Sequence, residues 1–171
     1  IFRINVSLQD AHTGELVVSL STEGNGEASI FSMVDDLTKR IKSSLKLSQD
    51  QITSDLDKEV GKITTSSPEA YKLYREGRYL HLELEFKQSI ALMEKAIAFD
   101  PEFAMAYRSL AVSYQNLRMY DEQRKYVQKA LDLSERLPEH EKLLIQGDFY
   151  RDSDSTYDKA IESYEKLLRL Y

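Results

Sequence analysis

Cysteine is absent from the 171-residue sequence, and its absence limits the chemistry of the chain. Disulfide bonds, thiolate nucleophiles and sulfur-ligated metal sites are excluded. No apolar run approaches the roughly 20 residues that cross a bilayer, and no charged and then apolar leader begins the chain. The sequence starts at Ile1 and ends within a helical pattern. We therefore interpret it as a fragment of a longer protein, with any targeting segment outside it.

Basic residues are outnumbered by acidic ones. The chain has 23 Lys and Arg against 29 Asp and Glu, a formal net charge of −6. An acidic balance without a basic run disfavours nucleic acid and anionic membranes as main partners. The hydrophobic share of 42% is enough for a core. We expect a protein or peptide partner, no nucleic acid and no direct membrane insertion.

The strongest pattern in the sequence is a repeat with a period of 34 residues. Small and bulky positions recur at this interval: Gly77, Leu80, Met93 and Ala96 return as Ala111, Tyr114, Val127 and Ala130. Gly147, Tyr150 and Ala160 mark a third copy in slipped register. This period is typical of a helix–turn–helix solenoid. The small residue lets two antiparallel helices approach, and the resulting pairs must stack to bury their apolar stripes.

These residues resemble the tetratricopeptide repeat family. The first copy follows the spacing of the family at Leu73, Gly77, Leu80, Ser89, Met93, Ala96 and Pro101, and the second does so at Tyr107, Leu110, Ala111, Tyr114, Val127 and Ala130. Gln123 and Glu135 depart from it, where the family prefers a small residue and a proline. The resemblance implies a mainly α fold, a helical-hairpin solenoid over 67–171. About three repeats are expected, near 68–101, 102–137 and 138–171.

The N-terminal region predicts a different, α+β unit over 1–47. Residues 2–8 and 16–20 alternate apolar and polar side chains around a turn with Asp10 and Gly14, which indicates a β-hairpin. Apolar residues every three or four positions predict an amphipathic helix over 30–47. The polar stretch that follows, 48–66, is typical of a linker.

Two helix starts carry an N-capping pattern. Ser67 suits the N-cap of a helix, and Pro68 suits the first helical position. The negative charge of Glu69 would lie at the positive end of the helix dipole. We expect Asp100 and Pro101 to form the same N-capping pattern at the start of the second helix pair.

Parts of the N-terminal half resemble a second, narrower family. Residues 8–15, 31–41 and 63–71 are similar to the tail of the TolB N-terminal-like domain and its junction to tetratricopeptide repeats. That arrangement is found in large bacterial Ser/Thr kinases and transcriptional regulators. The resemblance implies a partial domain of a bacterial signalling protein, on its cytoplasmic or periplasmic side.

Catalytic and metal-binding patterns are not found in the sequence. His12, His81 and His140 lack a second ligand at helical spacing. The acidic pairs Glu139 and Glu141, and Asp152 and Asp154, are interpreted as solvated faces. Residues 24–26 form a glycine-rich turn without the rest of a phosphate-binding fingerprint. We expect no enzymatic activity, no catalytic residue, no cofactor and no metal.

The resemblance to the repeat family implies a binding surface on the concave side, where the first helix of each pair lies. Its lining residues would be Tyr71, Tyr74, Arg78, His81, Met105, Arg108, Val112 and Gln115. Tyrosine, methionine and arginine are favoured at protein interfaces. The same residues could instead pack against the helix at 30–47 or a neighbouring chain. The family's clamp for a C-terminal carboxylate is not reproduced, because Tyr74, Arg78, Val112, Leu144 and Asp148 occupy its positions.

Three functions follow as hypotheses. The first is a non-catalytic interaction or scaffold module that binds a peptide or protein on the concave face. The second is self-association, including a homodimer, through an unpaired hairpin edge or an exposed apolar end. That end would consist of Tyr164, Leu167, Leu168 and Tyr171. The third is the sensing of a small ligand among Tyr74, His81 and Arg108.

Overall fold

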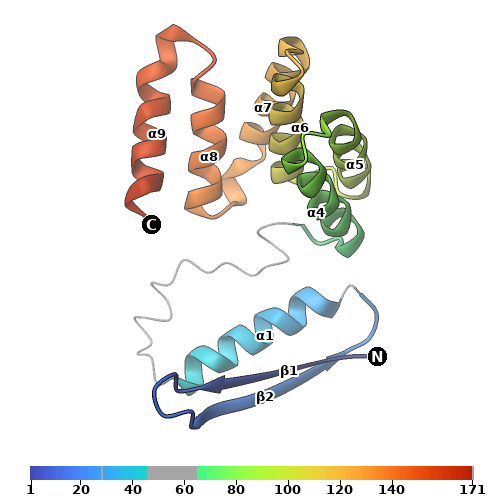
Figure 1. Cartoon of the computed structure of the whole chain (residues 1–171), viewed down its shortest axis with the longest axis vertical. Coiled ribbons are helices and arrows are strands. Elements are labelled where there is room, and N and C mark those ends of the chain that lie inside the picture. The colour runs from blue at the N-terminus through green and yellow to red at the C-terminus, as the bar shows by residue number, and fades with distance from the viewer. Residues whose placement is uncertain (28, 46–64, 171) are drawn as a thin grey trace. The chain divides into compact units, whose positions relative to one another are not determined.

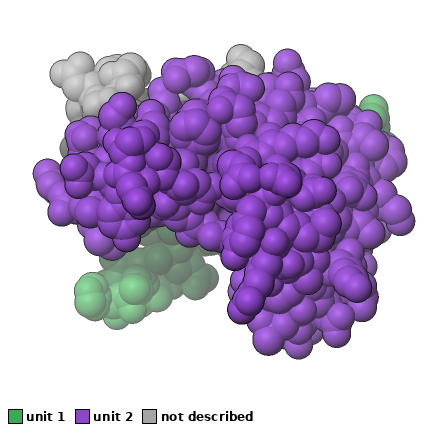
Figure 2. All heavy atoms as spheres, turned by 90° about the horizontal axis from the view of Figure 1, so that it is seen from above, with its two compact units in different colours: residues 1–62 green, residues 63–171 purple. Residues whose placement is uncertain are grey.

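The computed structural model describes residues 1–27, 29–45 and 65–170. The chain divides into two compact units, Ile1–Lys62 and Ile63–Tyr171 (Figure 1, Figure 2). The predicted linker at 48–66 lies outside the described residues, except for its last two positions. Of these two, Thr65 is buried within the second unit.

The first unit contains the predicted β-hairpin. Strands β1 (Phe2–Gln9) and β2 (Leu16–Gly24) are antiparallel, with Val6 opposite Leu20. In the turn, Asp10 Oδ1 accepts hydrogen bonds from the backbone N–H groups of His12 and Thr13, both at 2.8 Å. Gly14 adopts a φ of +71°, a conformation that glycine reaches without strain.

Helix α1 (Ser29–Ser44) packs on one face of this hairpin, mainly against β2. Its residues Met33 and Leu37 are buried, whereas Ile4, Val6 and Leu8 of β1 are only half-buried. The edge of β1 that faces away from β2 has no strand partner among the described residues.

The second unit is built from helices that pair in sequence order. They are α4 (Pro68–Leu82), α5 (Phe86–Phe99), α6 (Ala104–Asn116), α7 (Tyr120–Asp132), α8 (Glu139–Tyr150) and α9 (Tyr157–Arg169), with 3₁₀ turns η1 (Ser134–Arg136) and η2 (Asp154–Thr156). The pairs α4–α5, α6–α7 and α8–α9 lie side by side (Figure 1). The predicted fold, a helical-hairpin solenoid preceded by a β-hairpin and a helix, is confirmed.

Close helix approach at the small positions is also confirmed. A Cβ atom at Gly77 would lie 2.9 Å from the Cε methyl of Met93, across the α4–α5 pair. A Cβ atom at Gly147 would overlap the ring of Tyr164, across the α8–α9 pair. Ala111 holds the same place in α6 and is buried. Each pair therefore depends on a side chain of one carbon or none at this point.

The core lies between successive pairs. Phe103, in the turn between α5 and α6, is fully buried and packs on Tyr74 with ring centroids 4.8 Å apart. Met93, Leu110 and Ile145 are also fully buried. One helix pair alone could not remove these side chains from water, so stacking is required.

The two predicted N-caps have different outcomes. Ser67 caps α4 as expected, because its Oγ accepts a hydrogen bond from the N–H of Ala70 at 3.1 Å. The expectation for Asp100 is wrong, because α6 begins only at Ala104 and lacks a side-chain cap. Asp100 instead closes the preceding turn, accepting the backbone N–H of Glu102 at 3.0 Å.

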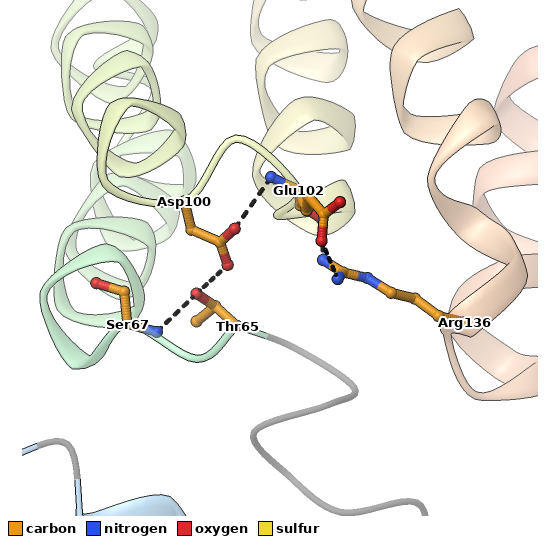
Figure 3. A network of polar contacts seen from close by, with 5 residues as sticks. All are labelled: Thr65, Ser67, Asp100, Glu102 and Arg136. Carbon is orange, nitrogen blue, oxygen red and sulfur yellow. Dashed lines mark hydrogen bonds and ion pairs between the residues drawn. The ribbon is translucent and has the colours of Figure 1, made fainter.

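Asp100 also belongs to a polar network that joins three turns (Figure 3). Its Oδ2 accepts a hydrogen bond from the Thr65 hydroxyl at 2.5 Å, just before α4. On the other side, Arg136 Nη1 in η1 pairs with Glu102 Oε2 at 2.7 Å. The turns of successive helix pairs are therefore linked at one end of the unit.

The turns within the first two pairs share an unusual backbone conformation. Leu84 has a φ of +63° and Arg118 has a φ of +59°, and these residues are one repeat period apart. The left-handed region costs an ordinary L-residue about 1–2 kcal/mol. The same turn geometry therefore recurs in both repeats, although the residue with the positive φ is neither glycine nor asparagine.

We expect Leu84→Asn to raise the free energy of unfolding by about 0.5–1 kcal/mol, because asparagine tolerates a positive φ. Little packing would be lost, since Leu84 is 72% exposed. Urea unfolding measures the change. Leu82→Asn is the control, because Leu82 is equally exposed at 72% but lies in the last turn of α4 and has no positive φ that asparagine could relieve. A Leu84→Asn protein no more stable than the wild type would contradict the argument.

Candidate functional site

A hollow of about 240 Å³ lies between α4 and α6, the first helices of the first two pairs. We refer to it as the α4–α6 hollow. Its lining residues are Arg78, His81, Leu82, Arg108, Ser109 and Val112. It is therefore a small surface that combines two guanidinium groups, one imidazole and apolar side chains.

The structure brings half of the predicted concave residues together there. Those that line the α4–α6 hollow are Arg78, His81, Arg108 and Val112. Of the others, Tyr74 and Met105 are only 7% and 4% exposed, and their side chains belong to the core. Tyr71 is half-buried against that core, and Gln115 accepts a hydrogen bond from Arg151. The accessible part of the predicted surface is thus smaller than expected.

His81 is held at the hollow by hydroxyl groups. Its Nδ1 lies 2.9 Å from Ser113 Oγ, which in turn is 3.3 Å from Ser89 Oγ. Ser89 and Ser113 are fully buried, so the imidazole lies at the end of a buried polar chain. Burial lowers the pKa of His81, and the charges of Arg78 and Arg108 lower it further. The ring is therefore predominantly neutral at pH 7.

The two arginines differ in their surroundings. Arg78 is exposed, lies 6.0 Å from the centroid of the Tyr74 ring, and has no ion-pair partner among the described residues. Arg108 is more enclosed, and its Nε lies 2.8 Å from Asp148 Oδ2. Within the part of the chain that the structure describes, one guanidinium therefore lacks a compensating carboxylate, and the other is anchored by one.

Asp148 is the centre of a buried cluster between the second and third pairs. This residue of α8 is only 5% exposed. Its Oδ1 accepts the Tyr164 hydroxyl at 2.7 Å and lies 3.7 Å from Arg151 Nη1. Together with Arg108, these groups compensate the buried carboxylate, as a charge removed from water requires.

Tyr164 and Glu141 correct two sequence expectations. Tyr164 was expected in an exposed apolar end, but it is half-buried, with its ring at Gly147 and its hydroxyl on Asp148. Burial raises the pKa of this hydroxyl, and Asp148 raises it further, so it stays protonated. Glu141 was interpreted as solvated, but burial raises the pKa of its carboxyl, opposed by the charge of Arg108.

The exposed apolar side chains of α9 include Leu168, as predicted, together with residues that were not predicted. Leu168 is 77% exposed, and Ile161 and Tyr157 are also exposed. Leu167 is half-buried, and Tyr171 lies outside the described residues.

Asp148 and Arg151 were not among the predicted lining residues, although the repeat contains a signal for them. Counted from the small residue of each first helix, Asp148 is the counterpart of Arg78 and Val112. Arg151 is likewise the counterpart of His81 and Gln115. The prediction named lining positions in two copies only. Extending the same positions to the third copy identifies both residues.

The described residues hold neither a metal-binding cluster nor a membrane-spanning helix. Within residues 1–27, 29–45 and 65–170, no group of three His, Asp or Glu side chains is arranged to hold a metal ion. No described helix has the length and apolar character needed to cross a bilayer.

Comparison with known families supports the repeat assignment. Residues 106–136 match the tetratricopeptide repeat. The match covers most of α6, all of α7 and η1. No curated protein matches the chain significantly. The match does not reach residues 1–47, so the resemblance of that region to the TolB N-terminal-like domain stays a prediction.

We expect Tyr164→Phe to lower the free energy of unfolding by about 1.5–3 kcal/mol, the range for a hydrogen bond to a charged group. The lost O–H group leaves buried Asp148 with one donor fewer. Chemical denaturation measures the loss. Tyr157→Phe, on the same helix but 54% exposed, should change stability by less than about 0.5 kcal/mol. Equal effects of the two substitutions would refute the role of the cluster.

The imidazole of His81 should titrate below 6.5, its ordinary value. Proton NMR of the three histidines, assigned with His81→Asn, measures the midpoint. Since the folded state disfavours the charged ring, His81 contributes stability above pH 6.5 that is lost as the pH falls through its lowered pKa. Between pH 7 and pH 5, the unfolding free energy of the His81→Asn protein should therefore decrease less than that of the wild type. A midpoint at or above 6.5 would contradict this assignment.

Proposed function

We propose that the helical unit is a non-catalytic protein-binding module whose contact site is the α4–α6 hollow. Tetratricopeptide repeats generally mediate protein–protein interaction. The observation that carries the proposal is the pair of arginines that line the hollow beside Val112 and Leu82. This combination suits a carboxylate-bearing segment of a partner that also places an apolar side chain there.

The charges around the hollow support an acidic partner. Arg78 has no acidic partner among the described residues, whereas Asp148 and Glu141 already surround Arg108. An incoming carboxylate would therefore gain most from Arg78. The planar guanidinium presents paired N–H donors to a carboxylate, which gives orientation as well as attraction. Arg108 would act as a second, fixed donor, because Asp148 holds its Nε.

The arrangement favours binding over chemistry. His81 is a neutral ring tied to Ser113, and Asp148 is occupied by one tyrosine and two arginines. The carboxylate of Asp148 is therefore compensated within the protein and is not free to accept a proton from a bound molecule. A small carboxylate ligand could occupy the same hollow, so ligand sensing remains the alternative use of this site.

Arg78→Glu should weaken partner binding at least tenfold, which is about 1.4 kcal/mol. The partner is first captured from lysate with the wild-type chain, identified, and then titrated in purified form. Lys72→Glu is the matched control, because it makes the same charge change at an exposed position of α4 outside the hollow. Equal affinities of the wild type and Arg78→Glu would refute the site.

Self-association is the second candidate function, and the hairpin favours it. The outer edge of β1, which has no strand partner in the described part of the chain, lacks proline and has no charge on its half-buried face, and prolines and charges are features that protect sheet edges. Pairing of β1 with β1 of a second copy would extend the sheet. Light scattering across a tenfold dilution distinguishes the two candidates, because a persistent monomer excludes the homodimer.

We also propose which kind of larger protein contains these two units. Residues 8–15, 31–41 and 63–71 resemble the tail of the TolB N-terminal-like domain and its junction to tetratricopeptide repeats. On this basis the two units belong to a larger bacterial signalling or regulatory protein, in which the helical unit serves as a scaffold for a protein partner.

A further inference from the structure

A second hollow, of about 410 Å³, lies among α5, α6 and α7. Ile97, Tyr107 and Tyr126 contribute apolar surface to it, and Lys125, Lys129 and Asp132 contribute charge. We refer to it as the tyrosine–lysine hollow. Its size is within the range of about 300–1,000 Å³ that is usual for ligand pockets.

This hollow is separate from the α4–α6 hollow. The only helix that contributes to both is α6, which places Arg108, Ser109 and Val112 in one hollow and Tyr107 in the other. At about 100° per residue, Tyr107 lies roughly opposite the mean direction of those three side chains. A molecule in one hollow therefore does not occupy the other.

The two tyrosines of the tyrosine–lysine hollow, Tyr107 and Tyr126, form a preordered aromatic stack with Tyr114, which lies outside its lining. Tyr126 stacks on Tyr114 with centroids 5.4 Å apart and an angle of 6° between the rings. Tyr107 lies on Tyr126 at 6.3 Å and 27°. The Tyr114 hydroxyl donates a hydrogen bond to Glu94 Oε1 at 3.2 Å, which fixes that end of the stack. Such a surface can bind an apolar or aromatic side chain without losing much side-chain entropy.

The lysines place positive charge beside this surface. Lys125 Nζ lies 5.0 Å from the centroid of the Tyr126 ring, and Lys129 follows one helical turn later. Neither lysine has an ion-pair partner among the described residues, in contrast to the neighbouring pair of Arg124 and Asp121. The single acid of the hollow, Asp132, accepts a hydrogen bond from Gln128 at 2.8 Å.

We propose that the tyrosine–lysine hollow binds an acidic segment of a partner protein that carries an aromatic side chain. The aromatic ring packs on Ile97, Tyr107 and Tyr126, and carboxylates on either side of it pair with Lys125 and Lys129. Charge complementarity selects this occupant, because two ammonium groups that have no ion-pair partner among the described residues border an apolar floor in a chain of net charge −6. The proposal does not depend on the function of the α4–α6 hollow.

The test is an NMR titration of the ¹⁵N-labelled full chain with the peptide EEFEE at millimolar concentration. Saturable shifts are expected at the amides of Tyr107 and of residues 125–129. The peptides EEGEE and QQFQQ should each bind at least fivefold more weakly, since one lacks the ring and the other lacks the charge. Lys129→Glu should weaken EEFEE binding at least fivefold. Lys95→Glu is the control, because it reverses an exposed charge on α5 outside the hollow.

Several outcomes would overturn the proposal. These are the absence of saturable shifts, shifts confined to Arg78, Arg108 and their neighbours, and equal binding of EEFEE and QQFQQ. Shifts of the same amides with protein concentration, in the absence of peptide, would assign the hollow to a second copy of the chain instead. EEFEE bound in the α4–α6 hollow would shift the amides of Arg78 and Arg108, whereas the affinity of the tyrosine–lysine hollow is measured from the shifts of Tyr107 and residues 125–129, so failure at one hollow is distinguished from failure at the other.

Discussion

The helical unit depends on the close approach of the two helices in each pair. Gly77 and Gly147 lie where the methyl of Met93 and the ring of Tyr164 fill the space that a side chain would need. This contact lets each pair present a continuous apolar surface to the next pair. At the third pair it has a second effect, because the ring beside Gly147 carries its hydroxyl to Asp148. A packing constraint therefore also builds the buried polar cluster.

That cluster gives the first helices of the three pairs an uneven distribution of charge. The acids that face Arg108 come from α8, so the second and third pairs neutralise one another. The first pair supplies Arg78 and has no acid to match it among the described residues. The net charge of −6 conceals this local basic surface. An acidic protein can thus attract an acidic segment, because attraction at contact distance depends on local charges and solvent screens distant ones.

Most of the fold could be predicted from the sequence, whereas only part of the candidate site could. The period of 34 residues and the small positions identify helix pairs because close packing restricts those positions to Gly or Ala. The same periodicity places Tyr74 and Arg78 on one helix side, but it does not reveal that Phe103 covers the ring of Tyr74. Such coverage depends on the path of the turn between pairs, where Asp100 closed the turn instead of capping α6. The cluster at Asp148 joins residues far apart in the sequence, which local patterns do not couple.

The contacts of the helical unit are mostly between elements adjacent in the sequence, with α5 joining α4 to α6 and α7 joining α6 to α8. Such a chain has a low contact order, so folding should be fast and should spread from one pair to the next. The cluster around Asp148 then couples the folding of the third helix pair to that of the second pair. Its strength decides whether α8 and α9 unfold together with the rest of the unit or open separately in native-state hydrogen exchange.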